Sequence, residues 1–372
     1  MQHRFEAVFM FLHDIGRSVD LAHTRRIIPA SQDARVLTTR DTPASLSIPE
    51  PLQIDIAAVV FPDSKPFEEI RLSAKIYEDG VISMIVRVLT RIELTQIHTI
   101  RGLQFSVGEG GQTTIGRWSN EQFQTLLEQI LPSVEVGEYG TVADQRERYA
   151  AFCLIDPVRN PARFVDTHSQ YLSTFLLGEN PEIELHDSQV RTTLDHRFSF
   201  KKNDMLILDL DRCFIIDPDR DYEDILLILE LANYQLLELR TLDRLLDRWL
   251  DLAEDDIRSV YLKRSHRLRS LSRKMGRLLP LRLDALFVLE NLENTAKIIG
   301  DYYLGQVYEH VCTLMGTGSW ERSVHRRLEA LQEIYSMAKV DVNERLLLIM
   351  EILVVLLIGF ELAALMFPFP LR

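Results

Sequence analysis

Cysteine is scarce in this chain, which has 372 residues and only three cysteines. Cys153, Cys213 and Cys312 are widely separated, and each lies within an apolar stretch. An odd, scattered set of thiols argues against a disulfide framework and lacks the spacing of a zinc site. We therefore expect buried, reduced thiols and a reducing compartment.

Linear catalytic signatures are also missing. No serine lies in a GxSxG context, and no two of the ten histidines have the HExxH spacing. The glycine-rich stretch 108–111 lacks the Lys-Ser/Thr pair of a phosphate loop and the GxGxxG spacing of a dinucleotide site. We expect a non-catalytic protein with no cofactor, no metal and no small-molecule substrate. An enzyme whose site is assembled from distant residues is the alternative.

An excess of positive charge is absent too. Asp and Glu outnumber Lys and Arg by 55 to 42, and this net charge of −13 argues against nucleic-acid binding by the whole surface. Residues 258–282 depart from this pattern because they contain nine basic residues and no acid. Such a block repels itself unless it contacts a polyanion, either lipid headgroups or nucleic-acid phosphate, or unless acids of the preceding segment such as Glu254 neutralise it. The nine residues are Arg258, Lys263, Arg264, Arg267, Arg269, Arg273, Lys274, Arg277 and Arg282.

The first 220 residues have the pattern of an α+β domain. Apolar runs at residues 4–12, 53–61, 68–77, 81–89 and 149–156 predict strands. Asp79-Gly80 predicts a hairpin between two of these strands, and another hairpin is predicted within residues 204–218. One short helix is predicted to end at Arg26 with Ser18 or Asp20 as its cap, and another is predicted from Ser119 to about Leu131 with Ser119 or Asn120 as its cap. We expect a mixed, mostly antiparallel sheet in a cytoplasmic domain of residues 1–220.

Residues 221–345 change to a helical pattern. The stretch 222–256 contains no Gly or Pro, and its apolar residues recur at intervals of three and four. This spacing predicts a long amphipathic helix with coiled-coil potential. Pro280 interrupts the pattern, and Gly316 with Gly318 separates two further helices. We expect a helical bundle or coiled-coil stalk.

An apolar segment follows at residues 346–367. Its 22 residues would span about 33 Å as a helix, which matches a hydrocarbon core of about 30 Å. The N-terminal residues do not have the pattern of a signal or transit peptide, and basic residues gather before the segment. The pattern predicts one C-terminal transmembrane helix and a tail-anchored, single-pass protein of the inner (cytoplasmic) membrane, with its N-terminal bulk cytoplasmic.

Two acids, Glu351 and Glu361, lie inside this apolar segment. An acid in hydrocarbon costs about 2–3 kcal/mol on insertion scales, so its presence indicates function or assembly. The two acids are about 80° apart around a helix, and Gly359 permits close approach of another helix. We predict an assembly site at Glu351, Gly359 and Glu361 in a homo-oligomer that contacts membrane lipid. Pairing of Glu351 with Arg345 at the membrane interface is one alternative, and ion or proton conduction through this oligomer is another.

An acidic cluster lies at the hairpin within residues 204–218 and the start of the long helix. Carboxylates at this density are able to bind Mg²⁺ or Ca²⁺. The cluster lacks the central Gly and distal Glu of a calcium loop, and aspartates also suit turns and helix N-termini. We interpret the cluster as structural. Its members are Asp209, Asp211, Asp217, Asp219, Asp221, Glu223 and Asp224.

Residues 221–247, 290–310 and 320–362 carry a family resemblance. They resemble the required for meiotic nuclear division family, in which an α+β body precedes long helices and one C-terminal span. Asn343, Arg345 and Glu361 match the Asn/Arg and late Glu of its terminal motif. The resemblance implies an inner-membrane protein that supports translation by tethering ribosomes. From this we infer that the basic block contacts ribosomal RNA. The chain is also similar in outline to the CorA-type magnesium channel, but the Gly-Met-Asn signature of that channel is absent.

Together these patterns predict a tail-anchored, non-catalytic adaptor or scaffold. We expect it to self-associate through its helices and to present the α+β domain to a cytoplasmic partner, with a ribosome or another RNA-containing particle as the candidate. An oligomeric channel or CorA-like transporter is the first alternative, and an enzyme with a dispersed site is the other.

Overall fold

The computed structural model describes residues 2–33, 51–61, 66–107, 111–136, 146–262 and 301–366, together with a few positions between 283 and 290. Its contacts divide the chain into two units. Unit 1 comprises residues 1–241 and 290–320, and unit 2 comprises residues 242–289 and 321–372. The long helices α6 (Glu223–Leu262) and α9 (Thr317–Met366) contribute to both units.

Unit 1 is built on a nine-stranded sheet with the strand order β11-β12-β13-β10-β1-β6-β5-β4-β3. Its paired strands are antiparallel except β10 and β13, which pair in parallel. This confirms the mixed, mostly antiparallel sheet of the predicted α+β fold. The strands are β1 (Gln2–Asp14), β3 (Gln32–Asp33), β4 (Leu52–Val60), β5 (Phe67–Ile76), β6 (Val81–Glu93), β10 (Arg146–Leu154), β11 (Arg197–Phe198), β12 (Met205–Leu208) and β13 (Arg212–Ile216). Two small sheets pair β2 (Ser18–Val19) with β9 (Val134–Glu135) and β7 (Gln104–Ser106) with β8 (Gln112–Thr114).

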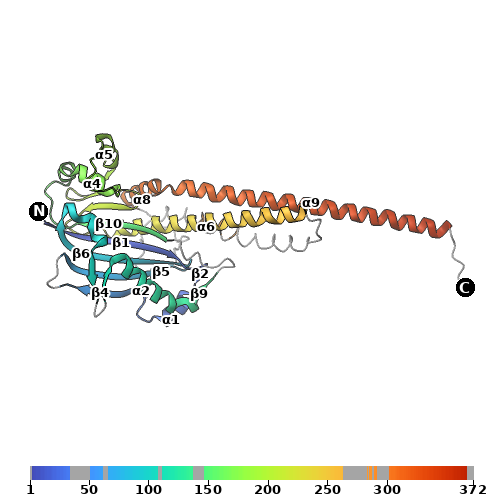
Figure 1. The fold of residues 1–372 in the computed structure, drawn as a ribbon, viewed down its shortest axis with the longest axis horizontal. Helices are drawn as coiled ribbons and strands as arrows, with labels where there is room; N and C mark the ends of the chain where they lie inside the picture. The colour runs from blue at the N-terminus through green and yellow to red at the C-terminus, as the bar shows by residue number, and fades with distance from the viewer. Residues whose placement is uncertain are drawn as a thin grey trace. The chain divides into compact units, whose positions relative to one another are not determined.

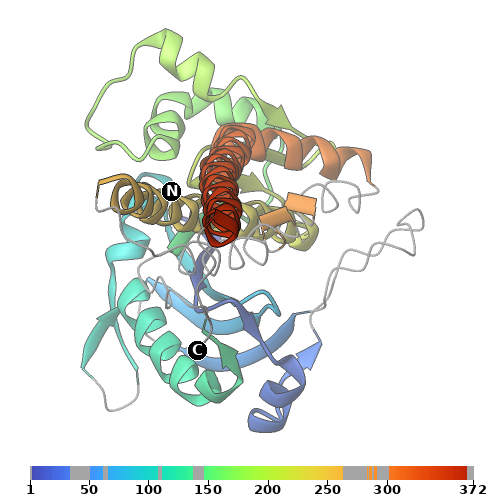
Figure 2. The same ribbon diagram turned by 90° about the vertical axis from the view of Figure 1, so that its right-hand side faces the viewer.

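Helices cover both faces of the main sheet, as the two views of Figures 1 and 2 show. The first part of α6 and helix α8 (Tyr302–Met315) pack on one face. The other face has its own core, formed with the remaining helices. Because β1 is covered on both sides, its residues 5–12 are buried and almost all apolar. The helices of this other face are α1 (Leu21–Ile27), η1 (Leu94–Gly102), α2 (Ile115–Ile130), η2 (Leu131–Ser133), α3 (Pro161–Thr167), α4 (Ser169–Leu176) and α5 (Asp187–Thr193).

Local signals located the β5–β6 turn and some of the helix ends. The predicted β5–β6 hairpin is confirmed, and Gly80 has a φ of +84° in its turn, where a Cβ would meet the Gly16 carbonyl oxygen at 2.0 Å. Asp20 caps α1 by accepting from the His23 N–H at 2.8 Å. The cap predicted at Ser119 or Asn120 is wrong: α2 begins at Ile115, because apolar residues before Ser119 also pack against the sheet.

Unit 2 consists of the later part of α6 and most of α9, together with residues outside the described set. Arg327 pairs with Asp243 at 2.9 Å and also with Asp247, and the Ser323 hydroxyl donates to Asp243 at 2.8 Å.

Gly316 ends α8 in a left-handed conformation with a φ of 66°, directly before α9. The predicted long helix after residue 221 and the break at Gly316 are therefore confirmed.

Residues 346–367 were predicted to be a transmembrane helix, and this prediction is wrong. Residues 346–366 continue α9, and no helix in the described part of the chain has the length and apolarity needed to cross a bilayer. Glu351 and Glu361 leave only the nine residues 352–360 uncharged between them, whereas a span needs about 20 apolar residues. The transmembrane part of the fold class, the tail anchor and the single-pass inner-membrane localisation are corrected accordingly.

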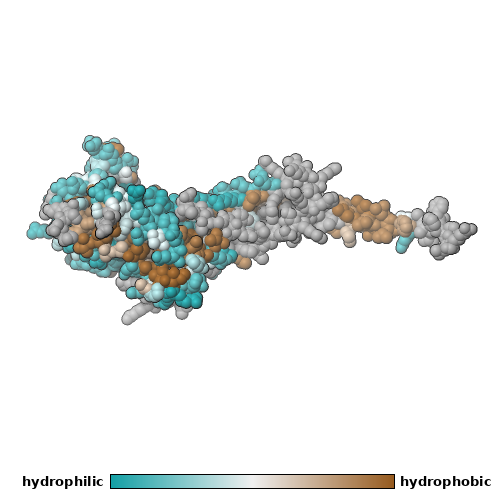
Figure 3. Space-filling view, turned by 60° about the horizontal axis from the view of Figure 1, so that its bottom comes forward, coloured by the Kyte–Doolittle hydropathy of each residue, from teal (hydrophilic) through white to brown (hydrophobic). Residues whose placement is uncertain are grey.

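The corrected segment is nevertheless apolar and exposed. All side chains of residues 347–362 are exposed, and Figure 3 shows apolar surface in brown near the C-terminal end of the chain.

Candidate functional site

The turn between β13 and α6 is held in a strained conformation. The buried Asp217 carboxylate accepts from the N–H groups of Asp219 at 2.9 Å and Asp221 at 3.0 Å. Arg220 has a φ of 58°, the one positive value at a non-glycine residue among the described residues. Such backbone conformations cost of order 1–3 kcal/mol and persist where the surroundings over-determine them. This turn therefore places the Arg220 side chain with little freedom.

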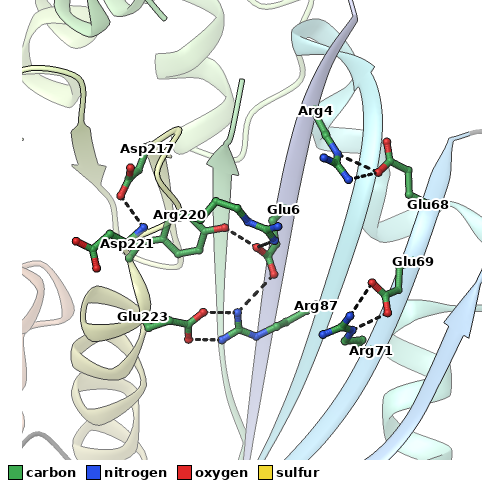
Figure 4. Close-up of polar contacts among 11 residues, drawn as sticks. Arg4, Glu6, Glu68, Glu69, Arg71, Arg87, Asp217, Arg220, Asp221 and Glu223 are labelled. Atoms are coloured by element: carbon green, nitrogen blue, oxygen red, sulfur yellow. Dashed lines mark hydrogen bonds and ion pairs between the residues drawn. The ribbon is translucent and has the colours of Figure 1, made fainter. Parts of the chain in front are cut away.

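Arg220 contributes to a charged network that ties the turn to the centre of the sheet (Figure 4). Glu6 on β1 accepts from Arg220 at 2.6 Å, from the Tyr222 hydroxyl and from Arg87 at 3.4 Å. Arg87 on β6 also donates two hydrogen bonds of 2.6 Å each to Glu223, the first residue of α6. Burial acts to raise the pKa of Glu6, but the hydrogen bonds from Tyr222 and Arg220 outweigh it and lower that pKa below its ordinary value. The network thus fixes the start of α6 against β1 and β6.

A cavity of about 140 Å³ lies beside this turn, within unit 1. Five aspartates and one lysine line it, against a wall of apolar and aromatic side chains. It joins the β11–β12 connection, strands β12 and β13, the start of α6 and the start of α8. The charged residues are Asp204, Asp217, Asp221, Asp224, Asp301 and Lys201, and the wall comprises Phe200, Met205, Leu206, Ile215, Ile216, Ile225, Tyr303 and Leu304.

The single lysine does not neutralise this cavity. Lys201 is held by Asp221 at 2.9 Å, with Asp219 at 3.8 Å, and its pKa is raised chiefly by the hydrogen bond to Asp221. Burial and the nearby Asp204 carboxylate raise the pKa of Tyr303 to about 12, so its hydroxyl keeps its proton near neutral pH. The cavity therefore combines an excess of negative charge with apolar surface.

Several aspartates also have structural tasks. Asp204 accepts from the N–H groups of Phe200 at 2.9 Å and Lys201 at 3.0 Å, and Asp301 caps α8 by accepting from the Leu304 N–H at 2.9 Å. In the residues that the structure describes, no group of three or more acidic, histidine or cysteine side chains is placed to share a metal ion. Asp204 and Asp301 thus stabilise a turn and a helix start.

The structure separates the predicted acidic cluster into different places. Asp217, Asp221 and Asp224 line the cavity, whereas Glu223 belongs to the network with Arg87. Asp219 lies at the turn and contacts Asn203 at 3.2 Å. The remaining two members, Asp209 and Asp211, lie at the β12–β13 turn and do not line the cavity.

Sequence reasoning missed Glu6, Arg87, Asp204, Asp301 and Tyr303. A charged residue inside the apolar β1 run was the available signal for Glu6. An aspartate directly before a helical segment was the signal for Asp301. No local pattern marks the other three, because folding alone brings them to this site.

Two predicted sites remain as predictions. Glu351, Gly359 and Glu361 lie on the exposed part of α9, with nothing within 4 Å of a Cβ built on Gly359. Arg258 belongs to the end of α6, but its side chain and residues 263–282 are outside the described residues. The polyanion contact and the ribosomal partner therefore stay predictions.

Comparison with known proteins places this architecture in a family. The model of the family described as uncharacterized protein MJ0711, N-terminal domain, matches residues 4–223. The uncharacterized protein MJ0711 of Methanocaldococcus jannaschii is 25% identical over 216 residues, which cover 58% of this chain and 64% of that relative, less than two thirds of its length. No solved structure matches.

The matched region includes the main sheet and all four charged side chains of the network, and it ends at Glu223. The resemblance to the required for meiotic nuclear division family is therefore wrong as an assignment. It rested on apolar helical segments after residue 220, whose composition is shared by many unrelated long helices. The chain belongs to the MJ0711 family, whose N-terminal domain is formed here by residues 4–223.

Proposed function

We propose that this protein is a non-catalytic adaptor, and that the aspartate-lined cavity of unit 1 receives a lysine or arginine side chain of a protein partner. The observation that carries the proposal is the composition of the cavity, with five aspartates, one engaged lysine and an apolar wall. A basic side chain is complementary to this lining: its cationic head would meet the aspartates, and its aliphatic stem would pack on the apolar wall.

The size of the cavity favours a single side chain. About 140 Å³ accommodates the stem and head of one such residue but is small beside the 300–1,000 Å³ typical of sites for drug-sized ligands. Asp221 is the carboxylate best placed to meet an incoming cation. It is an exposed lining residue, and its ion-pair partner is the long side chain of Lys201. A partner's cation would compete with Lys201 for Asp221.

We expect Asp221→Asn to weaken binding of N-acetyl-arginine amide about tenfold, measured by isothermal titration calorimetry of the full chain. The amide keeps the shape of the side chain but removes the charge that attracts the cation, and a charge-assisted hydrogen bond contributes about 1.5–3 kcal/mol. Asp195→Asn is the matched control, because Asp195 is exposed and does not line the cavity. Equal affinity for the wild type and for Asp221→Asn, or no binding to the wild type, would contradict the proposal.

Self-association through α9 is a second candidate function, favoured by the exposed apolar side chains of residues 347–362. Exposed apolar surface of this extent commonly marks a contact with a partner, and another copy of α9 supplies an identical surface. Glu351 and Glu361 would then lie at or beside the contact between copies.

Leu353→Lys with Leu357→Lys is expected to reduce the molar mass in light scattering to that of one chain, because the added charges repel and resist burial. The same double change at the polar positions Gln332 and Ser336, on the earlier part of α9, serves as the control and should leave the mass unchanged. A wild type that is monomeric at micromolar concentration would exclude this function.

A further inference from the structure

The strand register gathers arginines on the sheet face opposite α6. Successive side chains of a strand point to opposite faces of the sheet. On β10, Arg146 and Arg148 therefore lie on the same face as Phe152, a core residue of the face opposite α6, whereas Tyr149 lies on the other face. Arg212 on β13 also lies on the face opposite α6, because it is two residues before the core residue Phe214. The three guanidinium groups therefore project from two adjacent strands onto one face.

A fourth arginine reaches the same place from η1. Arg101 follows His98 by three residues, and residues with this spacing eclipse one another on a 3₁₀ helix. His98 is bonded to the Tyr171 hydroxyl of α4 at 3.3 Å, so this side of η1 faces α4. Arg212 donates to the Phe175 carbonyl of α4 at 3.0 Å, which brings α4 and β13 together with η1.

The four charges act on one another. Partial burial is the main cause that lowers the pKa of Arg101. The charges of Arg148 and Arg212, and more weakly that of Arg146, lower this pKa further, whereas Asp211 acts to raise it. Arg146 also contributes to lowering the pKa of His13 to about 4, after burial of that ring. The cluster thus concentrates positive charge in a chain whose net charge is −13.

Three of the four arginines have no acidic partner among the described residues, as is also true of Arg26, Arg159, Arg163 and Arg191 elsewhere in unit 1. Other arginines of unit 1 are paired with an acid, as in the contacts of Arg4 with Glu68, Arg87 with Glu223, Arg197 with Asp166 and Arg240 with Glu147. Within the described residues, Arg101, Arg146 and Arg148 make no ion pair and are exposed. Arg212 differs, because it is half-buried and engaged by Asp211 at 2.8 Å. Arg212 therefore adds positive charge to the cluster, while the other three arginines have guanidinium N–H groups available to bind a ligand.

We propose that Arg101, Arg146, Arg148 and Arg212 form a binding site for a compact phosphorylated small molecule that carries at least two phosphoryl charges. Guanidinium groups match the oxygen spacing of phosphate with paired hydrogen bonds. Bound phosphate would neutralise the positive charges of these guanidinium groups. Asp211 beside the cluster, and the acidic balance of the whole chain, favour a compact anion over an extended nucleic acid.

The test is calorimetric titration of the full chain with inorganic pyrophosphate at low ionic strength, for the wild type, Arg101→Gln, Arg148→Gln and Arg146→Gln/Arg148→Gln. We expect each single change to weaken binding at least tenfold and the double change to abolish it. Arg71→Gln is the control: Arg71 is exposed, lies on β5 three strands from β10 and pairs with Glu69. Its affinity should equal that of the wild type.

An additional measurement separates a ligand site from a structural cluster. Without ligand, Arg148→Gln should melt at or above the wild-type temperature because repulsion is relieved, while the increase in melting temperature that pyrophosphate causes in the wild type should disappear. Absence of wild-type binding at millimolar pyrophosphate, or affinity that the arginine changes leave intact, would overturn the proposal. Binding of a single-stranded RNA that depends on these arginines and that pyrophosphate does not displace would also overturn it, in favour of a nucleic-acid site.

Discussion

Replacing Glu6 by glutamine is expected to lower the free energy of unfolding of unit 1 by about 3 kcal/mol, the lower end of the cost of removing one partner from a buried ion pair. Glu6 is 7% exposed and is the common acceptor for Arg220 and Tyr222, while Arg87 approaches it from the side of β6. The neutral amide leaves the charges of two arginines without this counter-charge. Since Glu6 also holds the strained turn through Arg220, its loss frees that turn as well.

The measurement is urea unfolding of the full chain at pH 7.5, with far-ultraviolet circular dichroism as the readout. Glu69→Gln is the matched control, because it removes the same charge from a pair with the exposed Arg71, and such pairs contribute about 0–1 kcal/mol. If the two variants unfold at the same urea concentration, the network does not stabilise the fold.

The pH dependence of this effect has a definite sign. The pKa of Glu6 is lower in the folded chain than in the unfolded chain, where it is about 4.3. Its contribution is therefore present above the unfolded pKa and is lost as the pH falls through the folded pKa. The difference in stability between the wild type and Glu6→Gln should shrink accordingly in acid.

Replacing Asp14 by asparagine is expected to have the opposite effect and to stabilise unit 1 by about 2 kcal/mol at pH 8. Burial is the main cause that raises the pKa of Asp14 to about 6, despite hydrogen bonds from Thr241 and the Gly16 N–H. Burial and the carboxyl groups of Asp14 and Asp79 also raise the pKa of Glu238 well above its usual range. An amide at position 14 removes the cost of a buried charge and its repulsion of the Glu238 carboxylate.

The stability effect of Asp14→Asn depends on pH with the opposite sign to that of Glu6→Gln. A carboxyl group whose folded pKa is raised contributes stability that is complete below its unfolded pKa, about 3.9, and is lost as the pH rises through its folded pKa of about 6. The advantage of Asp14→Asn should therefore appear between about pH 4 and pH 6 and be absent at lower pH. Melting temperatures across this range, with Asp195→Asn as the exposed control, measure it. A constant difference from pH 3 to pH 8 would show that charge is not the cause.

Part of the cavity could be found from the sequence. The density of aspartates from Asp217 to Asp224 drew attention to the right turn, since acids close together in the chain remain close in the fold. Asp204, Asp301 and Tyr303 were not found, because Asp301 and Tyr303 lie about 80 residues after that turn and reach it when α8 packs on the sheet. The arginine cluster was missed for the same reason, since its members come from η1, β10 and β13.

By itself, the sequence determined the elements whose signals are local: the apolar strands, the Asp-Gly hairpin and the long helix after residue 221. It also determined the α+β class of the N-terminal part. Only the tertiary structure decided which charges meet, because Glu6 and Arg220 are 214 residues apart and no periodicity links them. Periodicity and turn chemistry act over a few residues, whereas ion pairs and cavities depend on strand order and helix packing that join distant segments.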